Sequence, residues 1–269
     1  MVDVITRLNV KVSGPADGQP MVFAHGFGCD QHMWRLVAPA FADRFRVILF
    51  DFVGAGGSDV SAYDPERYSS LEGYAGDVLD LVHALDLRDV VFVGHSVSAM
   101  IGALAEVTEP ERFAKLVMVG PSPRYVDEGS YVGGFAEEDI AELLDSLESN
   151  YLGWSAAMAP AIIGNPDRPA LGEELTESFC RMDPAVARQF ARVTFLSDAR
   201  EVLPRVTTPT LVLQCSDDLI APLAVGSYVR DAIPDSQMTV LRATGHCPHL
   251  SEPEETIAAM TTFVRGVVA

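Results

Sequence analysis

Short apolar runs rich in β-branched residues recur along the chain, with longer stretches of helical periodicity between them. The runs PMVFAHG, FRVILFD, VVFVGHS, KLVMVG, TLVLQC and QMTVLRA are nearly continuous rather than alternating. Strands buried on both faces have this pattern, because helices cover both sides of a parallel sheet. The more alternating segment TRLNVKVSG is typical of an edge strand. The pattern therefore predicts an α/β fold with a mostly parallel central sheet flanked by helices.

The stretches between the apolar runs differ in length. The segment SLEGYAGDVLDLVHALDL carries its apolar residues on one stripe and predicts a crossover helix. The gap between Gly120 and Thr210 is too long for one crossover and holds the helical segments EEDIAELLDSLESNYLGWSAAMA, GEELTESFCRM and PAVARQFARVTFLSDA. We therefore expect a core domain of residues 1–120 and 197–269, with residues 121–196 inserted as a helical lid.

Composition narrows the class of partner. The chain has 269 residues, enough for one large domain, and a formal net charge of −19. An acidic surface repels phosphate backbones and anionic membranes, so we expect neither nucleic acid nor membrane as a partner. The four cysteines form no CxxC pair, and the N-terminal residues MVDVITRLNV do not resemble a signal peptide. We expect reduced thiols and a cytoplasmic location.

Chemically useful side chains follow several of the apolar runs. Ser96, the pair Asp217 and Asp218, and His246 each come where a predicted strand ends. In open α/β sheets, ligands bind at the carboxyl ends of the strands. GHSVS around Ser96 matches the nucleophile turn G-x-S-x-G except for Ser98 in the last position. The positions therefore predict a site at one edge of the sheet, with Ser96 at its centre.

A serine hydroxyl becomes a nucleophile only beside a base that is itself oriented by a third group. The chain order serine, aspartate, histidine is that of the α/β hydrolases, with Ser96 as nucleophile and His246 as base. Asp217 and Asp218 are adjacent, so only one of them faces the histidine, and spacing leaves the choice open. His246 also forms an H-x-x-H pair with His249, but no third ligand lies nearby in the sequence, so we expect no metal and no cofactor.

The acyl-transfer intermediate needs two backbone N–H donors for its oxyanion. One donor is expected from Val97, the residue after the nucleophile, and the other from Phe27 in the AHGFG loop after the first buried run.

Together these residues resemble the α/β-hydrolase superfamily across essentially the whole chain. The segments GHSVSAMIG, VMVGPSPRY, NYLGW, DPAVARQFAR, FLSDAR and TGHCPHLSEPEET are similar to RsbQ, a bacterial stress-signalling hydrolase, and to the related plant strigolactone and karrikin receptors. Members of that group resemble this chain also in having serine, here Ser98, where the G-x-S-x-G pattern has its last glycine. The resemblance favours Asp218 over Asp217 and implies a four-helix lid over a small, closed, apolar pocket.

The resemblance also implies pocket residues, although each aromatic could instead belong to the core of the lid. By matching positions they are Phe27, Tyr125, Phe135, Trp154, Phe190 and Phe195. Members of this group are weak esterases on small substrates, and several act as sensors. RsbQ-like members work with a PAS-containing protein phosphatase that activates a stress sigma factor.

Two functions follow as hypotheses. The first is a serine hydrolase, esterase-like or lactonase-like, acting on a small apolar ester or lactone. The second is a ligand sensor with slow turnover that binds a partner phosphatase through its lid. Cofactor-free lyase or perhydrolase chemistry could use the same triad. Haloalkane and epoxide chemistry is disfavoured, because that reaction needs Asp where Ser96 stands.

Overall fold

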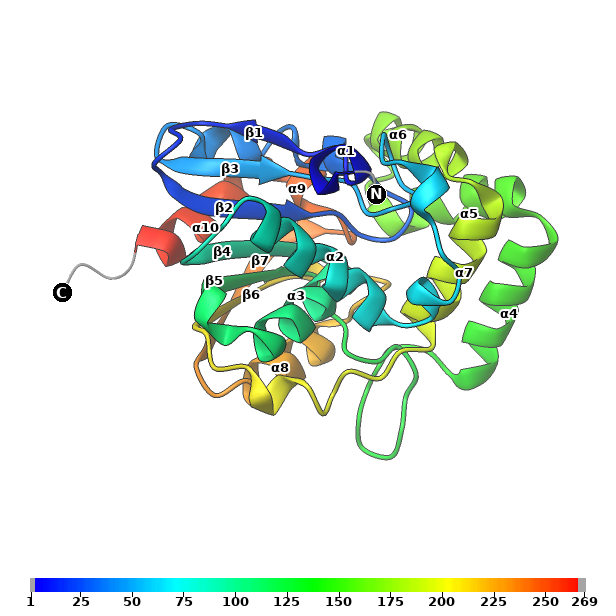
Figure 1. Ribbon diagram of the computed structural model, residues 1–269. Helices are drawn as coiled ribbons and strands as arrows, with labels where there is room; N and C mark the ends of the chain where they lie inside the picture. The colour runs from blue at the N-terminus through cyan, green and yellow to red at the C-terminus, as the bar shows by residue number, and fades with distance from the viewer. Residues whose placement is uncertain (1–2, 266–269) are drawn as a thin grey trace.

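The computed structural model describes residues 3–265 and shows a seven-stranded sheet in the order β1-β3-β2-β4-β5-β6-β7 (Figure 1). The strands are β1 (Lys11–Ser13), β2 (Gln19–Ala24), β3 (Phe45–Leu49), β4 (Val90–His95), β5 (Phe113–Val119), β6 (Thr210–Asp217) and β7 (Ser236–Thr244). Only β1 runs antiparallel, pairing with β3 at the edge of the sheet. The predicted α/β fold with a mostly parallel sheet is confirmed.

The N-terminal edge differs from its prediction. Thr6 and Arg7, expected in the edge strand, belong to the short helix α1 (Val4–Arg7), and the strand is confined to Lys11–Ser13. The cause is local, because the Asp3 carboxylate accepts hydrogen bonds from the N–H groups of Ile5 and Thr6 and starts a helical turn.

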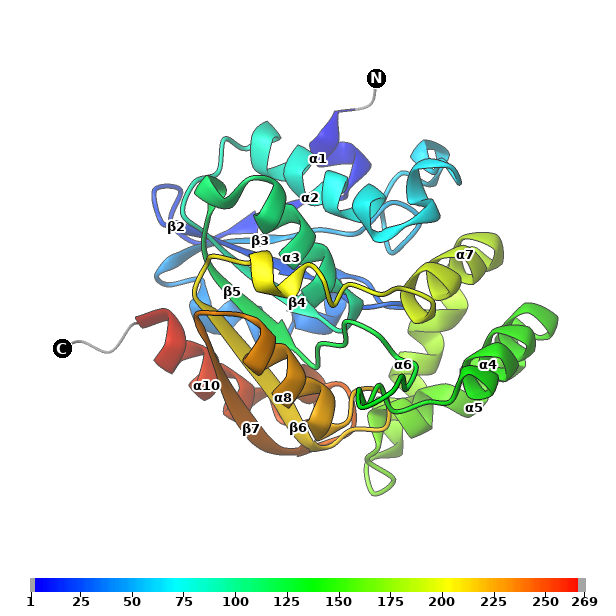
Figure 2. The same cartoon turned by 90° about the horizontal axis from the view of Figure 1, so that it is seen from below.

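Helices cover both faces of the sheet, so it lies between two apolar cores (Figures 1 and 2). One core packs against α2 (Leu71–Ala84), α3 (Val97–Thr108) and α8 (Leu223–Ala232), and the other against α10 (Pro253–Arg265). A short helix, α9 (Pro248–Ser251), precedes α10. The remaining short elements are the 3₁₀ turns η1 (Gln31–Trp34), η2 (Ala38–Phe41), η3 (Val60–Ala62), η4 (Arg67–Ser69), η5 (Pro110–Arg112) and η6 (Leu203–Arg205).

Four helices lie between β5 and β6, and we refer to them as the lid helices. They are α4 (Glu137–Ser149), α5 (Tyr151–Ile163), α6 (Pro169–Arg181) and α7 (Pro184–Phe195), grouped at one end of the sheet (Figures 1 and 2). The first helical segment of the sequence is two helices, because the chain bends at Asn150, whose side chain then caps α5 by accepting from Gly153 N at 3.0 Å.

Within residues 3–265, no helix combines the length and the apolar character that crossing a bilayer requires.

Candidate active site

Ser96 stands on a sharp turn between β4 and α3. Its φ of 58° and ψ of −126° are uncommon for a residue with a side chain. The turn brings α3 close to the strand, so a Cβ at position 94 would lie 2.4 Å from the Ser98 carbonyl oxygen, and only glycine fits there. The geometry is that of the nucleophile turn of α/β hydrolases and presents the hydroxyl at the end of the sheet.

Ser98, the departure from the usual turn pattern, has a structural partner. Its side chain is fully buried, and its hydroxyl donates a short hydrogen bond to the carbonyl of His25. That bond joins the start of α3 to the end of β2. A glycine at this position could not make it.

The structure brings the three sequence-predicted side chains together. His246 Nε2 lies 2.8 Å from Ser96 Oγ, and His246 Nδ1 lies 2.8 Å from Asp218 Oδ2. Asp218 Oδ1 accepts from the N–H groups of Ile220 and Ala221, which fixes the carboxylate. All three side chains are buried. The arrangement can pass a proton from the serine to the imidazole while the carboxylate orients the ring.

Asp217, the residue before Asp218, ends β6 and is exposed. Its backbone carbonyl accepts a hydrogen bond from Gly245 N at 2.7 Å. The turn after β6 is capped by Asp218 itself, so one carboxylate binds both the turn and His246.

Two further histidines lie beneath His246. His95 Nε2 is 2.8 Å from the His246 carbonyl oxygen, and the rings of His95 and His249 are 4.4 Å apart. Burial, with the nearby His246 and Arg35, lowers the pKa of His249 to about 3. Burial and the neighbouring histidines also hold the pKa of His95 well below its usual range. Both rings are therefore neutral near pH 7 and pack under the base.

Cys247 lies within reach of this histidine pair, a third group that spacing did not reveal. Its sulfur and one nitrogen each of His95 and His249 all lie within 4.8 Å of one another. Burial raises the pKa of the Cys247 thiol well above its usual range, which opposes the thiolate that a metal needs. His95 Nε2 is already bonded to the His246 carbonyl. The cluster suits packing better than metal binding.

The two expected oxyanion donors are backbone N–H groups beside Ser96. Among residues 3–265, no acceptor receives a hydrogen bond from the N–H of Phe27 or of Val97, the first residue of α3. His25 Nε2 accepts from Phe52 N at 3.2 Å, so Nδ1 carries the proton and donates to the Gly26 carbonyl at 2.9 Å. Because C=O and N–H of a trans peptide point in opposite directions, the Phe27 N–H faces away from His25.

Ser96 and His246 open into a small cavity of about 30 Å³. This volume holds about one water molecule. The lining residues are Phe27, Cys29, His95, Ser96, Tyr125, Ile162, Leu175, Phe179, Thr194, Phe195, Ile220, His246 and Cys247. Two buried polar atoms of this lining, Tyr125 Oη and Thr194 Oγ1, have no hydrogen-bond partner within the described chain. A ligand of several atoms therefore needs the aromatic side chains above Ser96 to move.

The predicted pocket aromatics occupy three kinds of place. Phe27, Tyr125 and Phe195 line the cavity. Trp154 and Phe190 lie behind it, with ring centroids 6.1 and 5.7 Å from that of Phe27.

Phe135 lies outside the lining. It pairs with Val126 through an isolated β-bridge and is half-buried.

Several lining residues carried no sequence signal of their own. Leu175 and Phe179 come from α6. The ring centroids of Phe179 and Phe27 are 5.7 Å apart, because α6 crosses the loop after β2. Cys247 and Thr194 could have been suspected, since each adjoins a predicted site residue, whereas nothing near Cys29 or Ile162 marked them.

Comparisons with known proteins agree with this geometry. The model of the family described as "Alpha/beta hydrolase family" matches residues 21–259. The chain is 37% identical over 262 residues to "Karrikin insensitive 2 receptor CA" of Petunia hybrida, covering 97% of each chain. It is 38% identical over 264 residues to "Strigolactone esterase D14" of Arabidopsis thaliana, covering 98% of this chain and 97% of that one.

Among solved structures, olei00960, a hydrolase from Oleispira antarctica, superposes with a TM-score of 0.95 at 40% identity, covering 98% of this chain and 97% of the other. The expected relationship to strigolactone and karrikin receptor hydrolases is confirmed, whereas the likeness to RsbQ stays a prediction. With a family match over most of its length and relatives above 30% identity across the whole chain, this protein belongs to the α/β-hydrolase family.

Proposed function

We propose that this protein is a serine esterase or lactonase that cleaves a small apolar ester or lactone. Ser96 Oγ attacks the carbonyl carbon while His246 Nε2 takes its proton, and Asp218 holds the ring in position. The N–H groups of Phe27 and Val97 stabilise the oxyanion. His246 then gives the proton to the leaving alkoxide, the acyl group remains on Ser96, and a water activated by His246 releases the carboxylic acid.

The observation that carries this proposal is the pair of 2.8 Å contacts that join Ser96, His246 and Asp218. A serine between a strand and a helix has no structural need for a buried imidazole that is itself bonded to a buried carboxylate. Family membership supports the reaction class, because relatives of this chain are named esterases.

The cavity supports the substrate class. Its walls are aromatic and aliphatic apart from the catalytic groups, His95, two thiols, Tyr125 and Thr194. Burial raises the pKa of Tyr125, so its hydroxyl stays protonated and can donate a hydrogen bond. A substrate with an apolar body and acceptor oxygens beyond the scissile carbonyl would satisfy both unpartnered hydroxyls. Lactones and small esters meet this description, and the mechanism requires no cofactor.

A sensor with slow turnover is the second candidate. The small volume of the cavity favours it, because a larger substrate must first displace the aromatic side chains that line the cavity, and this step can limit the rate. One relative of this chain is named as a receptor and another as an esterase. In that case we expect the lid to bind a partner protein phosphatase in the cytoplasm.

Intact mass spectrometry after incubation with a fluorophosphonate tests the nucleophile. We expect the wild type to gain one phosphonyl group, and Ser96→Ala to gain none. His246→Ala should label far more slowly while it keeps its fold by circular dichroism. Labelling of Ser96→Ala, or no labelling of a folded wild type, would refute the proposal.

Turnover of p-nitrophenyl acetate and of a synthetic butenolide then separates the two functions. A kcat near 1–10³ s⁻¹, roughly the usual range for enzymes, indicates a metabolic hydrolase. A single acylation followed by turnover over minutes indicates a sensor.

A further inference from the structure

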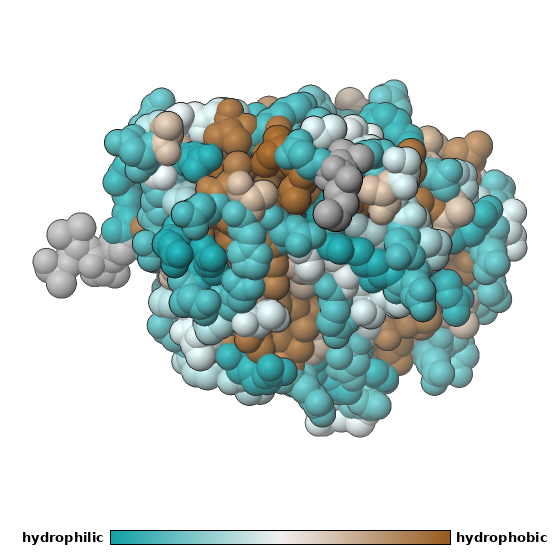
Figure 3. Space-filling model, in the orientation of Figure 1, coloured by the Kyte–Doolittle hydropathy of each residue, from teal (hydrophilic) through white to brown (hydrophobic). Residues whose placement is uncertain are grey.

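A second, larger hollow lies on the other side of α7. It is a surface groove of about 760 Å³ between the start of α2 and one side of α7. Its lining residues are Ser69, Ser70, Leu71, Glu72, Leu104, Ala185, Arg188, Gln189, Arg192, Val193, Leu196, Ser197, Asp198, Ala199 and Val202. Apolar surface shows between α2 and the lower end of α7, bordered by hydrophilic residues (Figure 3). Its volume is in the range typical of small-molecule sites, about 300–1,000 Å³.

Two arginines give one wall of this groove a positive charge. Arg188 and Arg192 are one helical turn apart on α7, so their side chains are neighbours. Within residues 3–265, neither makes an ion pair or a side-chain hydrogen bond, and Arg188 Nε is buried without a partner. Unpaired like charges a turn apart repel each other. An anion between them would relieve that repulsion and supply the missing acceptor.

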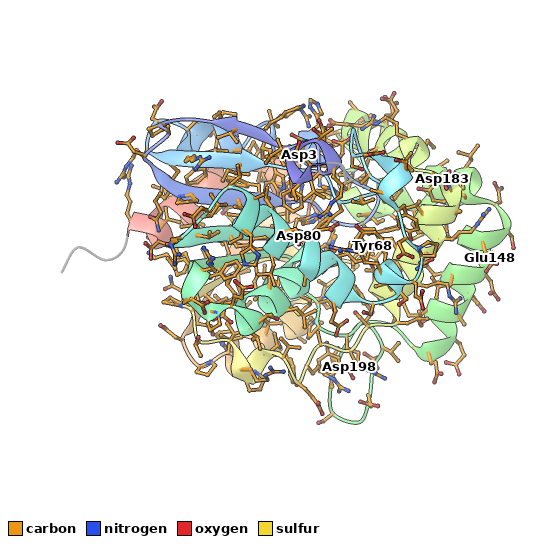
Figure 4. The ribbon with its side chains drawn as sticks, viewed as in Figure 1. Asp3, Tyr68, Asp80, Glu148, Asp183 and Asp198 are labelled. Carbon is orange, nitrogen blue, oxygen red and sulfur yellow. The ribbon has the colours of Figure 1, made fainter. Side chains whose placement is uncertain are left out.

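The acidic groups of the groove do not neutralise this wall. Asp198 binds Arg124 at 3.0 Å and Arg200 at 2.6 Å, and it lies at the lower edge of the molecule in Figure 4. Glu72 stands in the first turn of α2, on the opposite wall. A ligand with one negative charge therefore fits against α7, whereas a polyanion would meet Glu72.

Apolar side chains line much of the rest of the groove, beside the polar Ser69, Ser70, Gln189 and Ser197. Leu71, Leu104, Val193, Leu196 and Val202 come from α2, α3, α7 and the segment after it. Leu196 is 54% exposed and so offers apolar surface that a ligand could cover.

Because two unpaired arginines lie beside the leucines and valines of the groove, we propose that the groove between α2 and α7 binds an amphiphilic monocarboxylate. The carboxylate pairs with Arg188 and Arg192, and the alkyl or aryl body covers the leucines and valines. This site goes beyond the proposed hydrolase function and does not depend on Ser96.

The site adjoins the catalytic cavity through one helix. α7 turns Thr194 and Phe195 to the cavity and Arg188, Arg192 and Val193 to the groove. Gln189, also in the groove, ties α7 to the core by donating to the carbonyl of Tyr68 at 3.0 Å, and Figure 4 shows Tyr68 between α2 and α7. A ligand in the groove therefore contacts the helix that forms a wall of the cavity.

Isothermal titration calorimetry of Ser96→Ala with octanoate, below its micelle concentration, tests the proposal. We expect saturable binding to one site, weakened about 10-fold or more by Arg188→Ala and by Arg192→Ala, because each removes a charge-assisted hydrogen bond. Arg188→Lys should retain part of the affinity. Arg44→Ala changes an exposed arginine outside the groove and should bind as tightly as the parent.

Octanol and inorganic phosphate serve as matched probes for the apolar and anionic halves of the ligand. Each should bind at least 10-fold more weakly than octanoate. The proposal is overturned if folded Arg192→Ala binds octanoate like the parent, if octanol binds equally well, or if octanoate does not bind. Equal binding of phosphate would also overturn it, by showing an anion site without an apolar half.

Discussion

The hydrogen bond from Ser98 to the His25 carbonyl should support both stability and catalysis. Ser98→Ala removes this donor from a fully buried site and leaves the carbonyl without it. An unsatisfied buried acceptor costs about 1–3 kcal/mol. Ser98→Gly restores the common G-x-S-x-G pattern but adds the cost of glycine in the first turn of α3. We expect the free energy of unfolding of Ser98→Gly to be up to about 1 kcal/mol lower than that of Ser98→Ala.

The catalytic effect follows from the position of the bond. His25 precedes Gly26 and Phe27, whose N–H group is the proposed oxyanion donor. Losing one oxyanion donor entirely costs about 10²–10³ in kcat. Loosening the loop that carries it should cost less, about 10-fold, with little change in KM because the bond contacts no substrate.

Urea unfolding followed by circular dichroism gives the free energy of unfolding, and p-nitrophenyl acetate hydrolysis gives kcat and KM. A folded Ser98→Ala within about 0.5 kcal/mol of wild type would refute the stability argument. An unchanged kcat in a destabilised variant would show that the oxyanion loop is held by other contacts. Leu36→Ala, at an exposed position outside the nucleophile turn, serves as the control.

Further changes test other parts of the site. Asp218→Asn should lower kcat about 10⁴-fold, as loss of the orienting carboxylate does in other triads, with an unchanged circular dichroism spectrum. Gly245→Ala should lower the melting temperature strongly, because its Cβ would lie within 2 Å of the carbonyl oxygen of Ile163 in α5. Gly129 also has a positive φ but lies in open space, so Gly129→Ala should lower the free energy of unfolding by only about 1–2 kcal/mol. Burial opposes ionisation of Asp30, but a backbone N–H and Arg181 outweigh it and lower its pKa. The stability that Asp30 adds is therefore present above its unfolded pKa of about 4 and lost as pH falls through the lower folded value. The difference in the free energy of unfolding between wild type and Asp30→Asn, measured by urea unfolding, should stay constant from about pH 5 to 8. It should shrink below about pH 4.

The strands and the candidate triad could be predicted because short, continuous stretches of sequence identify both. Each buried strand is an apolar run, and Ser96 and His246 follow such runs directly. The break at Asn150 was missed because capping geometry, not hydrophobic periodicity, ends α4 there.

The cavity wall was harder to predict because it is made by packing between distant segments. Phe179 reaches the cavity only because α6 lies across the loop after β2, where a Cβ at position 28 would be 2.0 Å from its ring. Phe135 has the same aromatic character, but its backbone hydrogen-bonds to Tyr125 and Asp127 on a loop outside the cavity lining. Residue type identifies an aromatic core, and only the crossing of helices decides which aromatic side chains face Ser96.

The lid helices are bonded to the two loops that carry the proposed chemistry. At the end of α5, the Ile162 carbonyl accepts from His246 N at 2.8 Å, and Asn165 just beyond it donates to the Thr244 carbonyl at 3.0 Å. In α6, Ser178 Oγ donates to the Gly28 carbonyl at 2.9 Å, one residue after the proposed oxyanion donor.

A ligand too large for the cavity must move side chains or helices of this lid. If it enters by shifting the end of α5, it weakens the bond that holds the loop of His246, and proton transfer from Ser96 should slow. If it enters by shifting α7, both bonded loops stay in place and turnover should be fast. The identity of the helix that moves therefore links ligand size to rate, and it separates a hydrolase from a slow sensor within one fold.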